Sequence, residues 1–431
     1  MTPHPPERCL LEADFLGRSG VVPFRHQHLQ QLLPNHNLHT PGEWHQATTE
    51  LFDRVLRPTP TRWQELLPRL FPTPGMPCAH DLVGISHGLM QRLEEAHNPE
   101  RDPHGRFPAS ASLLTKHGVL RLPLVDWMAR CVVEKLRETT ALTLQTPQHR
   151  GALTFDVDSS GFWQASGLGG RLKRSVLQQK ANPTELPGSL WRTFRDFRRD
   201  PDRPFTWIAE QLAQRNTRCT VFVQAQKAHQ MDDYHLPRCP ALIRQLRSFH
   251  HCGHELGLHS SYAAPGRPPK FWSAQQQTLK RIFGLEQMPH RSHYIRHGDL
   301  IDDVERWKSF SLDSSLGYSW EPGFRLGTAW PVMLPGGVLE IAPHAMDVTL
   351  RHHQRYTPSE ARRALQGLYA AMEQTGGVFT ILWHPHNLNA LTWGPWRDVP
   401  FFLMDEQPQT PWETLTALRQ WFLQQWTPDA R

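Results

Sequence analysis

The feature that most constrains this chain is an alternation of strand-like and helix-like segments that begins near residue 151. Short apolar runs recur between amphipathic stretches whose apolar residues follow helical spacing. Because parallel strands need crossover connections, repeated strand–helix units predict a parallel sheet, either open or closed into a barrel. In both architectures, functional side chains gather at the carboxyl ends of the strands.

The same patterns predict the individual elements. Strands are expected at 152–156, 219–223, 255–259, 338–342 and 378–383. Helices are expected at 44–55, 87–96, 125–139, 190–199, 207–215, 240–250, 274–283, 301–310, 359–374 and 412–426. The helix at 359–374 has the clearest boundaries, with Ser359 expected as its N-cap after Pro358 and a pair of glycines, Gly376 and Gly377, after its last turn.

The first 145 residues differ in character from the rest of the chain. Six prolines fall between residues 58 and 77, and the turn-rich loop Asp102-Pro-His-Gly-Arg-Phe-Pro108 follows. Residues 146–151 read as a short linker. A chain of 431 residues is also long for one average domain. We therefore expect an N-terminal α/β accessory domain at 1–145, whose role the sequence does not assign, and a catalytic α/β domain at 146–431.

Composition narrows the expected partners and compartment. The net charge of +6 is spread over the chain, and aspartates interrupt the basic cluster Arg195, Arg198 and Arg199, so nucleic acid is not an expected partner. The six cysteines form no CxxC pair, which favours reduced thiols. Residues 1–20 lack the apolar core of a signal peptide, and no segment is long enough to span a bilayer. A cytoplasmic protein without a transmembrane segment is expected; the sequence sets no oligomeric state.

Polar residues end several of the predicted strands. Asp156 and Asp158 are two positions apart, so both project from one face of an extended chain. Two carboxylates at such a short distance repel each other, which favours a bound cation or a division of roles between a base and a metal ligand. His259 ends another strand and His384 follows the last one. A strand-end aspartate can instead form a turn, and such a histidine can be structural, but together these clusters predict a hydrolytic site.

The order of the motifs resembles that of the polysaccharide deacetylase (NodB-homology) superfamily. It reads TFDVD, GHELGLHSSY, RSHYIR, DSSLGY and LWHPH, from about residue 151 to the C-terminus. The segment 312–328 and the loop 102–108 are similar to a branch with an extra N-terminal region. The resemblance implies a distorted (β/α) barrel with an incomplete set of strands. It also implies a divalent metal, with zinc expected, and removal of acetyl groups from N-acetylated or O-acetylated sugars.

The resemblance implies roles for individual catalytic residues. Asp156 matches the general base, and Arg291 matches the arginine that orients it. His384 matches the general acid, and a backbone N–H near Tyr294 is expected to stabilise the oxyanion.

The metal ligands follow the family pattern only in part. Asp158 and His259 match two of them, but the position of the usual second histidine is Ala263. Catalytic zinc normally has three protein ligands, so we expect His293 to supply the third. The second choices are His344 and His386. The alternative is that the domain has lost its metal and, with it, catalysis.

Substrate contacts and the remaining functions stay open at this point. Tyr294, Asp313 and Trp383 are candidate substrate-binding residues, and the further candidates for sugar stacking or for orienting catalytic groups are Asp347, Trp320 and Trp330. The leading hypothesis is a deacetylase acting on a polysaccharide or its precursor. The alternatives are an amidase for a small non-sugar C–N bond and a catalytically silent glycan-binding protein of a polysaccharide assembly system.

Overall fold

The computed structural model describes residues 18, 82–139, 146–159, 187, 204–297, 310–334, 337–388 and 393–426. A nine-stranded sheet runs through this part of the chain. The strands lie in the order β6-β7-β5-β4-β3-β2-β1-β9-β8. All pairs are parallel except β6 with β7. The strands are β1 His149–Val157, β2 Thr220–Gln224, β3 Glu255–Ser260, β4 His290–Ser292, β5 Leu312–Asp313, β6 Val332–Met333, β7 Leu339–Glu340, β8 Ala345–Met346 and β9 Gly377–Trp383.

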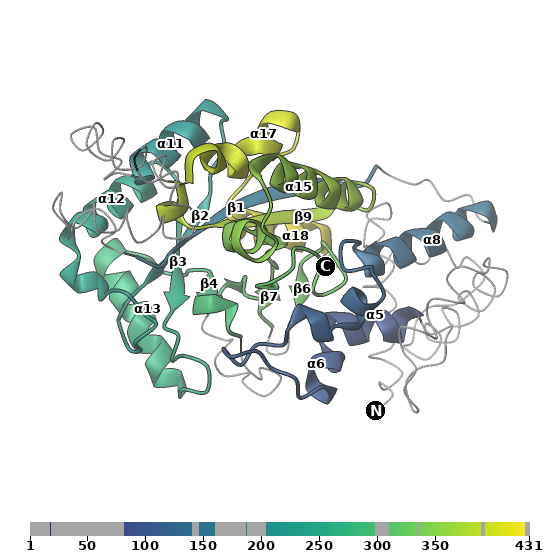
Figure 1. The fold of residues 1–431 in the computed structure, drawn as a ribbon, viewed down its shortest axis with the longest axis horizontal. Coiled ribbons are helices and arrows are strands. Elements are labelled where there is room, and N and C mark those ends of the chain that lie inside the picture. The colour runs from purple at the N-terminus through teal and green to yellow at the C-terminus, as the bar shows by residue number, and fades with distance from the viewer. Residues whose placement is uncertain are drawn as a thin grey trace, which may run out of the picture.

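Helices connect the parallel strands and cover the sheet. In Figure 1, α11, α12 and α13 lie to the left of β1 and β9, and α15 lies above β9. The helices are α5 Leu82–Met90, α6 Leu93–His97, α7 Leu113–Lys116, α8 Leu124–Thr139, α11 Pro204–Gln214, α12 Pro240–His251, α13 Pro269–Phe283, α15 Pro358–Glu373, α17 Phe402–Glu406 and α18 Leu415–Trp426. Short helical turns are η1 Ala109–Ala111, η4 Leu236–Arg238, η5 His293–Ile295, η7 Thr349–His353, η8 Pro385–Leu388 and η9 Gly394–Phe401.

The central strands are buried along almost their whole length. β2 and β9 are buried throughout, and β1 is buried from Gly151 to Val157. Strands that helices cover on both faces lose the alternation of polar and apolar residues and become continuous apolar runs, as β2 does. The sheet is open, with β6 and β8 at its two ends, so it forms a curled, incomplete barrel of mixed α/β type.

Most predicted elements are confirmed within one to three residues. The strands predicted at 219–223, 255–259 and 378–383 correspond to β2, β3 and β9. β1 begins at His149, so it takes in the second half of the predicted linker, and α13 begins five residues before the predicted start. The strand predicted at 338–342 is shorter in the structure, as β7. The helices predicted at 44–55, at 190–199 and over 301–309 lie outside the described residues.

Two predicted helix boundaries were wrong for identifiable reasons. The helix predicted at 87–96 is divided into α5 and α6, because Arg92 adopts a left-handed backbone with φ 56°. The N-cap of α15 is Thr357, not Ser359: the Thr357 side chain accepts from the Glu360 N–H, and the Glu360 side chain accepts from the Thr357 N–H. Pro358 therefore occupies the first helical position, where its missing N–H costs no hydrogen bond.

The described N-terminal residues pack directly against the sheet domain. Side chains of α5 and α8 belong to the same apolar core as those of β1 and β9. Glu95 pairs with Arg325 at 2.7 Å, and Asp126 accepts hydrogen bonds from Thr328 Oγ1 at 2.5 Å and from the Ala329 N–H at 2.8 Å. Residues 82–139 consist of helices joined by turns and loops, without strands among them. The domain boundary after residue 145 stays a prediction.

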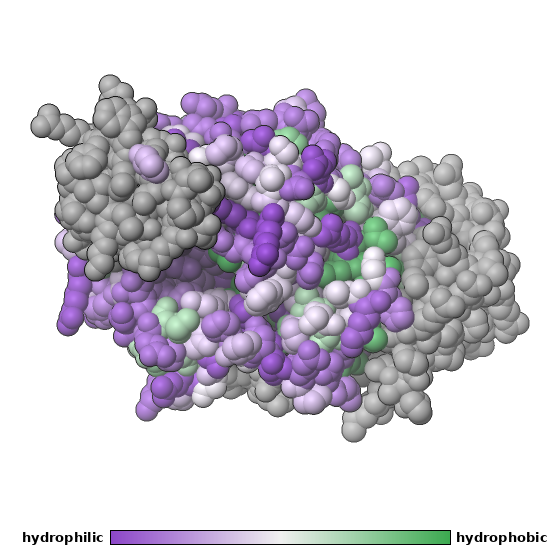
Figure 2. Space-filling model, viewed as in Figure 1, coloured by the Kyte–Doolittle hydropathy of each residue, from purple (hydrophilic) through white to green (hydrophobic). Residues whose placement is uncertain are grey.

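The described surface on the face shown in Figure 2 is mostly hydrophilic, and the apolar residues that are visible gather on the right, where α15 approaches α8. Among the described residues, no helix combines the length and apolar character needed to cross a bilayer.

Candidate functional site

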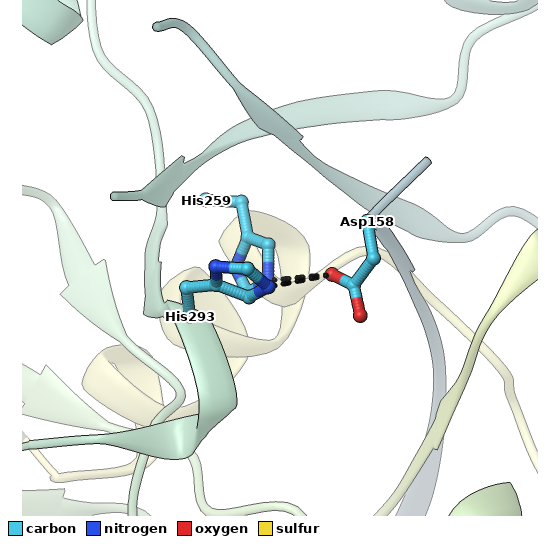
Figure 3. A group of neighbouring side chains, drawn as sticks. All are labelled: Asp158, His259 and His293. Atoms are coloured by element: carbon cyan, nitrogen blue, oxygen red, sulfur yellow. Dashed lines mark hydrogen bonds and ion pairs between the residues drawn. The ribbon is translucent and has the colours of Figure 1, made fainter. Parts of the chain in front are cut away.

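Three side chains with metal-binding atoms converge at the carboxyl ends of neighbouring strands. Asp158 follows β1, His259 lies near the end of β3, and His293 begins the turn η5 after β4. Their ligand atoms all lie within 4.8 Å of one another. Figure 3 shows both imidazole rings directed at the same carboxylate oxygen. The arrangement follows from the topology, since parallel strands deliver their carboxyl ends to one edge of the sheet.

The separations between the donor atoms suit a shared metal ion. The Asp158 Oδ1 atom lies 3.1 Å from His259 Nε2 and 3.4 Å from His293 Nε2. Two ligands that bind one tetrahedral zinc at about 2.0–2.2 Å are roughly 3.3 Å apart. Both histidines are buried, whereas the Asp158 side chain is 27% exposed. Among these three donors, the Asp158 carboxylate is therefore the exposed one.

Hydrogen bonds behind the two histidines fix which nitrogen faces the centre. His259 Nδ1 lies 3.1 Å from the Arg291 carbonyl, and His293 Nδ1 lies 3.1 Å from Asp232 Oδ1. Carbonyl and carboxylate oxygens only accept hydrogen bonds, so His259 Nδ1 carries the hydrogen and its Nε2 offers its lone pair. Asp232 favours the same tautomer of His293, which the neighbouring Gln224 side-chain amide, 2.8 Å from His293 Nδ1, fits when its oxygen faces the ring. Such partners orient histidines in metal sites and increase their basicity.

Asp232 is itself held as an anion by its surroundings. It accepts hydrogen bonds from Ser261 Oγ at 2.6 Å and from the backbone N–H of Tyr262 at 2.9 Å. Burial alone raises its pKa, but the hydrogen bonds from His293, Ser261 and Tyr262 outweigh burial and lower the pKa well below the usual range.

The charges around the three donors favour a cation. Burial opposes ionisation of Asp158, yet His384 and His293 hold its pKa well below the usual range. Burial likewise opposes protonation of His259, but Asp156 and Asp158 raise the pKa of this histidine. Two carboxylates thus act on one buried imidazole, and either a proton or a metal ion relieves that negative potential.

A buried arginine holds the second carboxylate of the β1 motif. Arg291 Nη1 donates to Asp156 Oδ1 at 2.9 Å and to Thr154 Oγ1 at 2.8 Å. The other guanidinium nitrogens donate to the Ser314 carbonyl at 2.6 Å and to Ser314 Oγ at 2.7 Å. The remaining carboxylate oxygen, Asp156 Oδ2, lies 3.8 Å from His259 Nε2. Asp156 therefore has one oxygen fixed by Arg291 and the other turned toward the candidate metal ligands.

A histidine–aspartate pair lies on the other side of Asp158. His384 Nδ1 lies 2.7 Å from Asp347 Oδ1, and its Nε2 lies 3.2 Å from Asp158 Oδ2. Asp347 also accepts from the His384 N–H and from Asn387 Nδ2, each at 2.9 Å. Although burial opposes the charged imidazole, Asp347 and Asp158 raise the pKa of His384 well above its ordinary value. These two carboxylates thus favour the protonated form of His384, which lies beside the candidate metal ligands.

The second-choice ligands, His344 and His386, do not belong to the converging group of three donors. His344 lies in the core, stacks on Phe379 and accepts a hydrogen bond from the Thr380 N–H at 3.1 Å. Burial lowers the pKa of His344 to about 3. The ring of His386 lies 5.4 Å from that of His384, and burial, aided by the charge on His384, lowers the pKa of His386 to about 4.

The candidate substrate-binding residues are spread over different environments. Tyr294 lies at the site, with its ring 4.8 Å from that of His293. Asp313 and Trp383 are fully buried, so the structure does not bring them to an open surface. Of the other tryptophans, Trp330 is buried against Trp421, whereas Trp320 is 51% exposed and lies over the His353 ring.

A second group, His297, Asp313 and Glu340, also places possible ligand atoms within 4.8 Å of one another. Its hydrogen bonds give it a structural role. Asp313 accepts from His290 at 2.6 Å and lies 3.0 Å from His297 Nε2. Burial and the neighbouring Asp313 carboxylate raise the pKa of Glu340 well above its ordinary value, whereas His290 and His297 hold the pKa of the buried Asp313 well below its usual range, so one carboxyl group is neutral and the other ionised. This network ties β4, β5 and β7 together.

Sequence reasoning missed Asp232 and Asn387, which orient His293 and Asp347. Asp232 lies eight residues beyond Gln224 at the end of β2, and Gln224 Nε2 also lies 2.8 Å from His293 Nδ1. β2 lies between β1 and β3, so polar residues after its carboxyl end must reach the same edge of the sheet. This rule for parallel strands could have pointed to Asp232 from the sequence.

Comparisons with known proteins give a family-model match and likenesses to solved structures. Residues 24–141 match the model of a family of unknown function, DUF7033. No curated protein matches the chain. Among solved structures, a presumed polysaccharide deacetylase from Mycobacterium smegmatis is similar, with 17% identity and a TM-score of 0.43, over 66% of this chain and 94% of that chain. At this level of similarity, the roles of individual residues depend on the geometry of the site itself.

Proposed function

We propose that this chain is a metal-dependent hydrolase that removes acetyl groups from N-acetylated or O-acetylated sugars in a polysaccharide or its precursor. The observation that carries the proposal is the convergence of Asp158, His259 and His293 on one point. That point lies between a buried carboxylate–arginine pair and a protonated histidine–aspartate pair. A hydrolase needs these three parts: a place for a Lewis acid, a base and an acid.

The donor set fits a divalent ion, with zinc the first choice. One carboxylate oxygen and two imidazole nitrogens form a common set for catalytic zinc, which leaves a further position open. When bound, such an ion polarises an acyl carbonyl and lowers the pKa of water. The silent glycan-binding alternative gives no reason for two buried histidines to face one carboxylate.

The protein's own groups then have separate tasks. Asp156, fixed by Arg291, accepts a proton from the attacking water. The backbone N–H of Tyr294 donates a hydrogen bond to the carbonyl oxygen as negative charge develops on it. His384, which Asp347 keeps protonated, donates its proton to the departing sugar nitrogen or oxygen.

Aromatic side chains beside these groups favour a sugar over a small amide. The rings of Tyr262 and Tyr294 lie 5.3 Å apart, and Tyr262 is held by Arg296, which lies 4.6 Å from its centroid. Flat aromatic rings with a polar end suit the apolar faces and hydroxyl groups of pyranoses.

Acetate release from a panel of acetylated sugars tests the proposal. We expect zinc-loaded protein to release acetate from at least one N-acetyl or O-acetyl glycan, or from a nucleotide- or lipid-linked acetylated sugar. Small non-sugar amides in the same panel test the amidase alternative. No acetate from any sugar, with zinc bound, would rule out the proposed function.

The pH profile of the reaction should depend on Asp347. Because Asp347 raises the pKa of His384, Asp347→Asn should lower that pKa. His384 works in its protonated form, so the alkaline limb of kcat should move to lower pH, and kcat at neutral pH should fall at least about tenfold. The control is Asp405→Asn, which removes a carboxylate that pairs with Arg215 at the surface. An unchanged alkaline limb in Asp347→Asn would exclude His384 as the acid.

A further inference from the structure

The turn that carries Tyr294 has an unusual backbone. Tyr294 has φ 62° and Ile295 has φ 46°, so two consecutive non-glycine residues are left-handed. For the β-branched Ile295 this conformation is especially rare. Left-handed non-glycine residues cost roughly 1–3 kcal/mol each and persist only where their surroundings hold them. Contacts outside η5 must therefore fix this turn.

An arginine from the N-terminal region supplies one such contact. Arg106 Nη1 donates to the Tyr294 carbonyl at 2.9 Å, across 188 positions of sequence. Its Nε and Nη2 atoms lie 2.8 Å and 2.7 Å from Asp102 Oδ2. The other oxygen of Asp102 accepts from the backbone N–H groups of His104 and Arg106, each at 2.9 Å. Asp102 thus orients the guanidinium toward the turn.

A second arginine, Arg296, makes a matching contact from the turn to the loop 102–106. Arg296, directly after the turn, donates through Nε to the His104 carbonyl at 2.7 Å and through Nη1 to the Tyr262 carbonyl at 2.8 Å. His104 Nδ1 lies 3.1 Å from the Tyr262 hydroxyl, and the His104 ring lies 4.8 Å from that of Tyr294. The loop 102–106 and the turn are therefore locked by a reciprocal pair of arginine–carbonyl contacts.

We infer that Arg106 is a positioning residue for the catalytic site, so that the N-terminal loop 102–106 completes a site otherwise built by the sheet domain. Along the chain, the Tyr294 N–H has a fixed group on each side. Asp232 holds the His293 ring before it, and Arg106 holds the Tyr294 carbonyl after it. These two contacts restrict rotation of the backbone on both sides of the N–H and so restrict its direction. The inference rests on the proposed function, in which this N–H meets the developing oxyanion.

Kinetics of Arg106 variants test this role. In Arg106→Ala we expect kcat to fall about 10- to 100-fold while KM changes less than about threefold, because misplacement of a transition-state donor lowers kcat. Arg106→Lys should behave similarly, since a single ammonium cannot reproduce the guanidinium fork. The matched control is Arg121→Ala, which removes another contact between the N-terminal region and the sheet domain, to the Tyr356 hydroxyl. Zinc content should be unchanged in all three variants.

Hydrogen–deuterium exchange supplies a readout that does not depend on activity. Amides in residues 290–297 should exchange faster in Arg106→Ala and Arg106→Lys than in wild type or Arg121→Ala, with exchange elsewhere in the sheet domain unchanged. Unchanged exchange at 290–297, or a kcat within about twofold of wild type in Arg106→Ala, would overturn the inference. If wild type releases no acetate from any sugar, the proposed function fails, and the exchange measurement still decides whether Arg106 holds the turn.

Discussion

Asp156→Asn should lower kcat for acetate release by about 10²- to 10⁴-fold, the usual contribution of a general base. Asparagine has the same shape and keeps an oxygen that can accept from Arg291 Nη1, but it cannot take a proton from water. Zinc binding should persist, because Asp156 is not among the three converging donors. Steady-state kinetics with metal analysis of the same samples make the measurement.

The same substitution should also lower stability. Arg291 is fully buried, and Asp156 is the carboxylate that pairs with it. Breaking a buried ion pair from one side costs roughly 3–5 kcal/mol, since it leaves an uncompensated charge. The free energy of unfolding, measured with denaturant, should fall by about that amount. Asp233→Asn, at an exposed aspartate that accepts from Ser159 Oγ, is the control and should change neither quantity. An Asp156→Asn variant that retains a tenth of the wild-type kcat would exclude this base.

His293→Ala should remove most of the bound zinc. It takes away one of three protein donors, and two donors rarely suffice for a catalytic zinc site. Loss of orienting partners alone costs about 10- to 100-fold in metal affinity, so loss of a donor should cost at least about 100-fold. The fold should persist, because Asp232 keeps its hydrogen bonds from Ser261 and Tyr262. Competition with a chelator gives the affinity.

His386→Ala is the matched control for this prediction. His386 is also a histidine next to the site, with its ring 5.4 Å from that of His384, yet it does not belong to the converging group. We expect this variant to hold zinc as wild type does. Equal zinc affinity in His293→Ala and wild type, or zinc loss in His386→Ala, would contradict the assignment of the third ligand.

The long apolar strands made much of the site predictable from the sequence. β1, β3 and β9 have five or more residues of clear strand character, so the polar residues at their ends could be assigned to one edge of a parallel sheet. Asp158, His259 and His384 do lie together there. His293 follows from the chemical need for a third donor, and the structure brings it to the same point.

The short strands and the long-range contacts were not predictable in this way. β5 has two residues, which is too few to show an alternation of faces, so nothing indicated that Asp313 is buried. Trp383 ends β9 on a strand buried throughout, where a face cannot be read from periodicity either. The contact between Arg106 and Tyr294 joins segments far apart in sequence, and no local pattern encodes such a pairing.

The most direct test of the metal centre is anomalous X-ray diffraction at the zinc edge from crystals of the zinc-loaded wild-type protein. We expect one strong peak at about 2.0–2.2 Å from an oxygen of Asp158 and from Nε2 of both His259 and His293. Its occupancy should fall on chelation. No peak between these three residues in zinc-loaded crystals, or a peak at His297, Asp313 and Glu340 instead, would contradict the account.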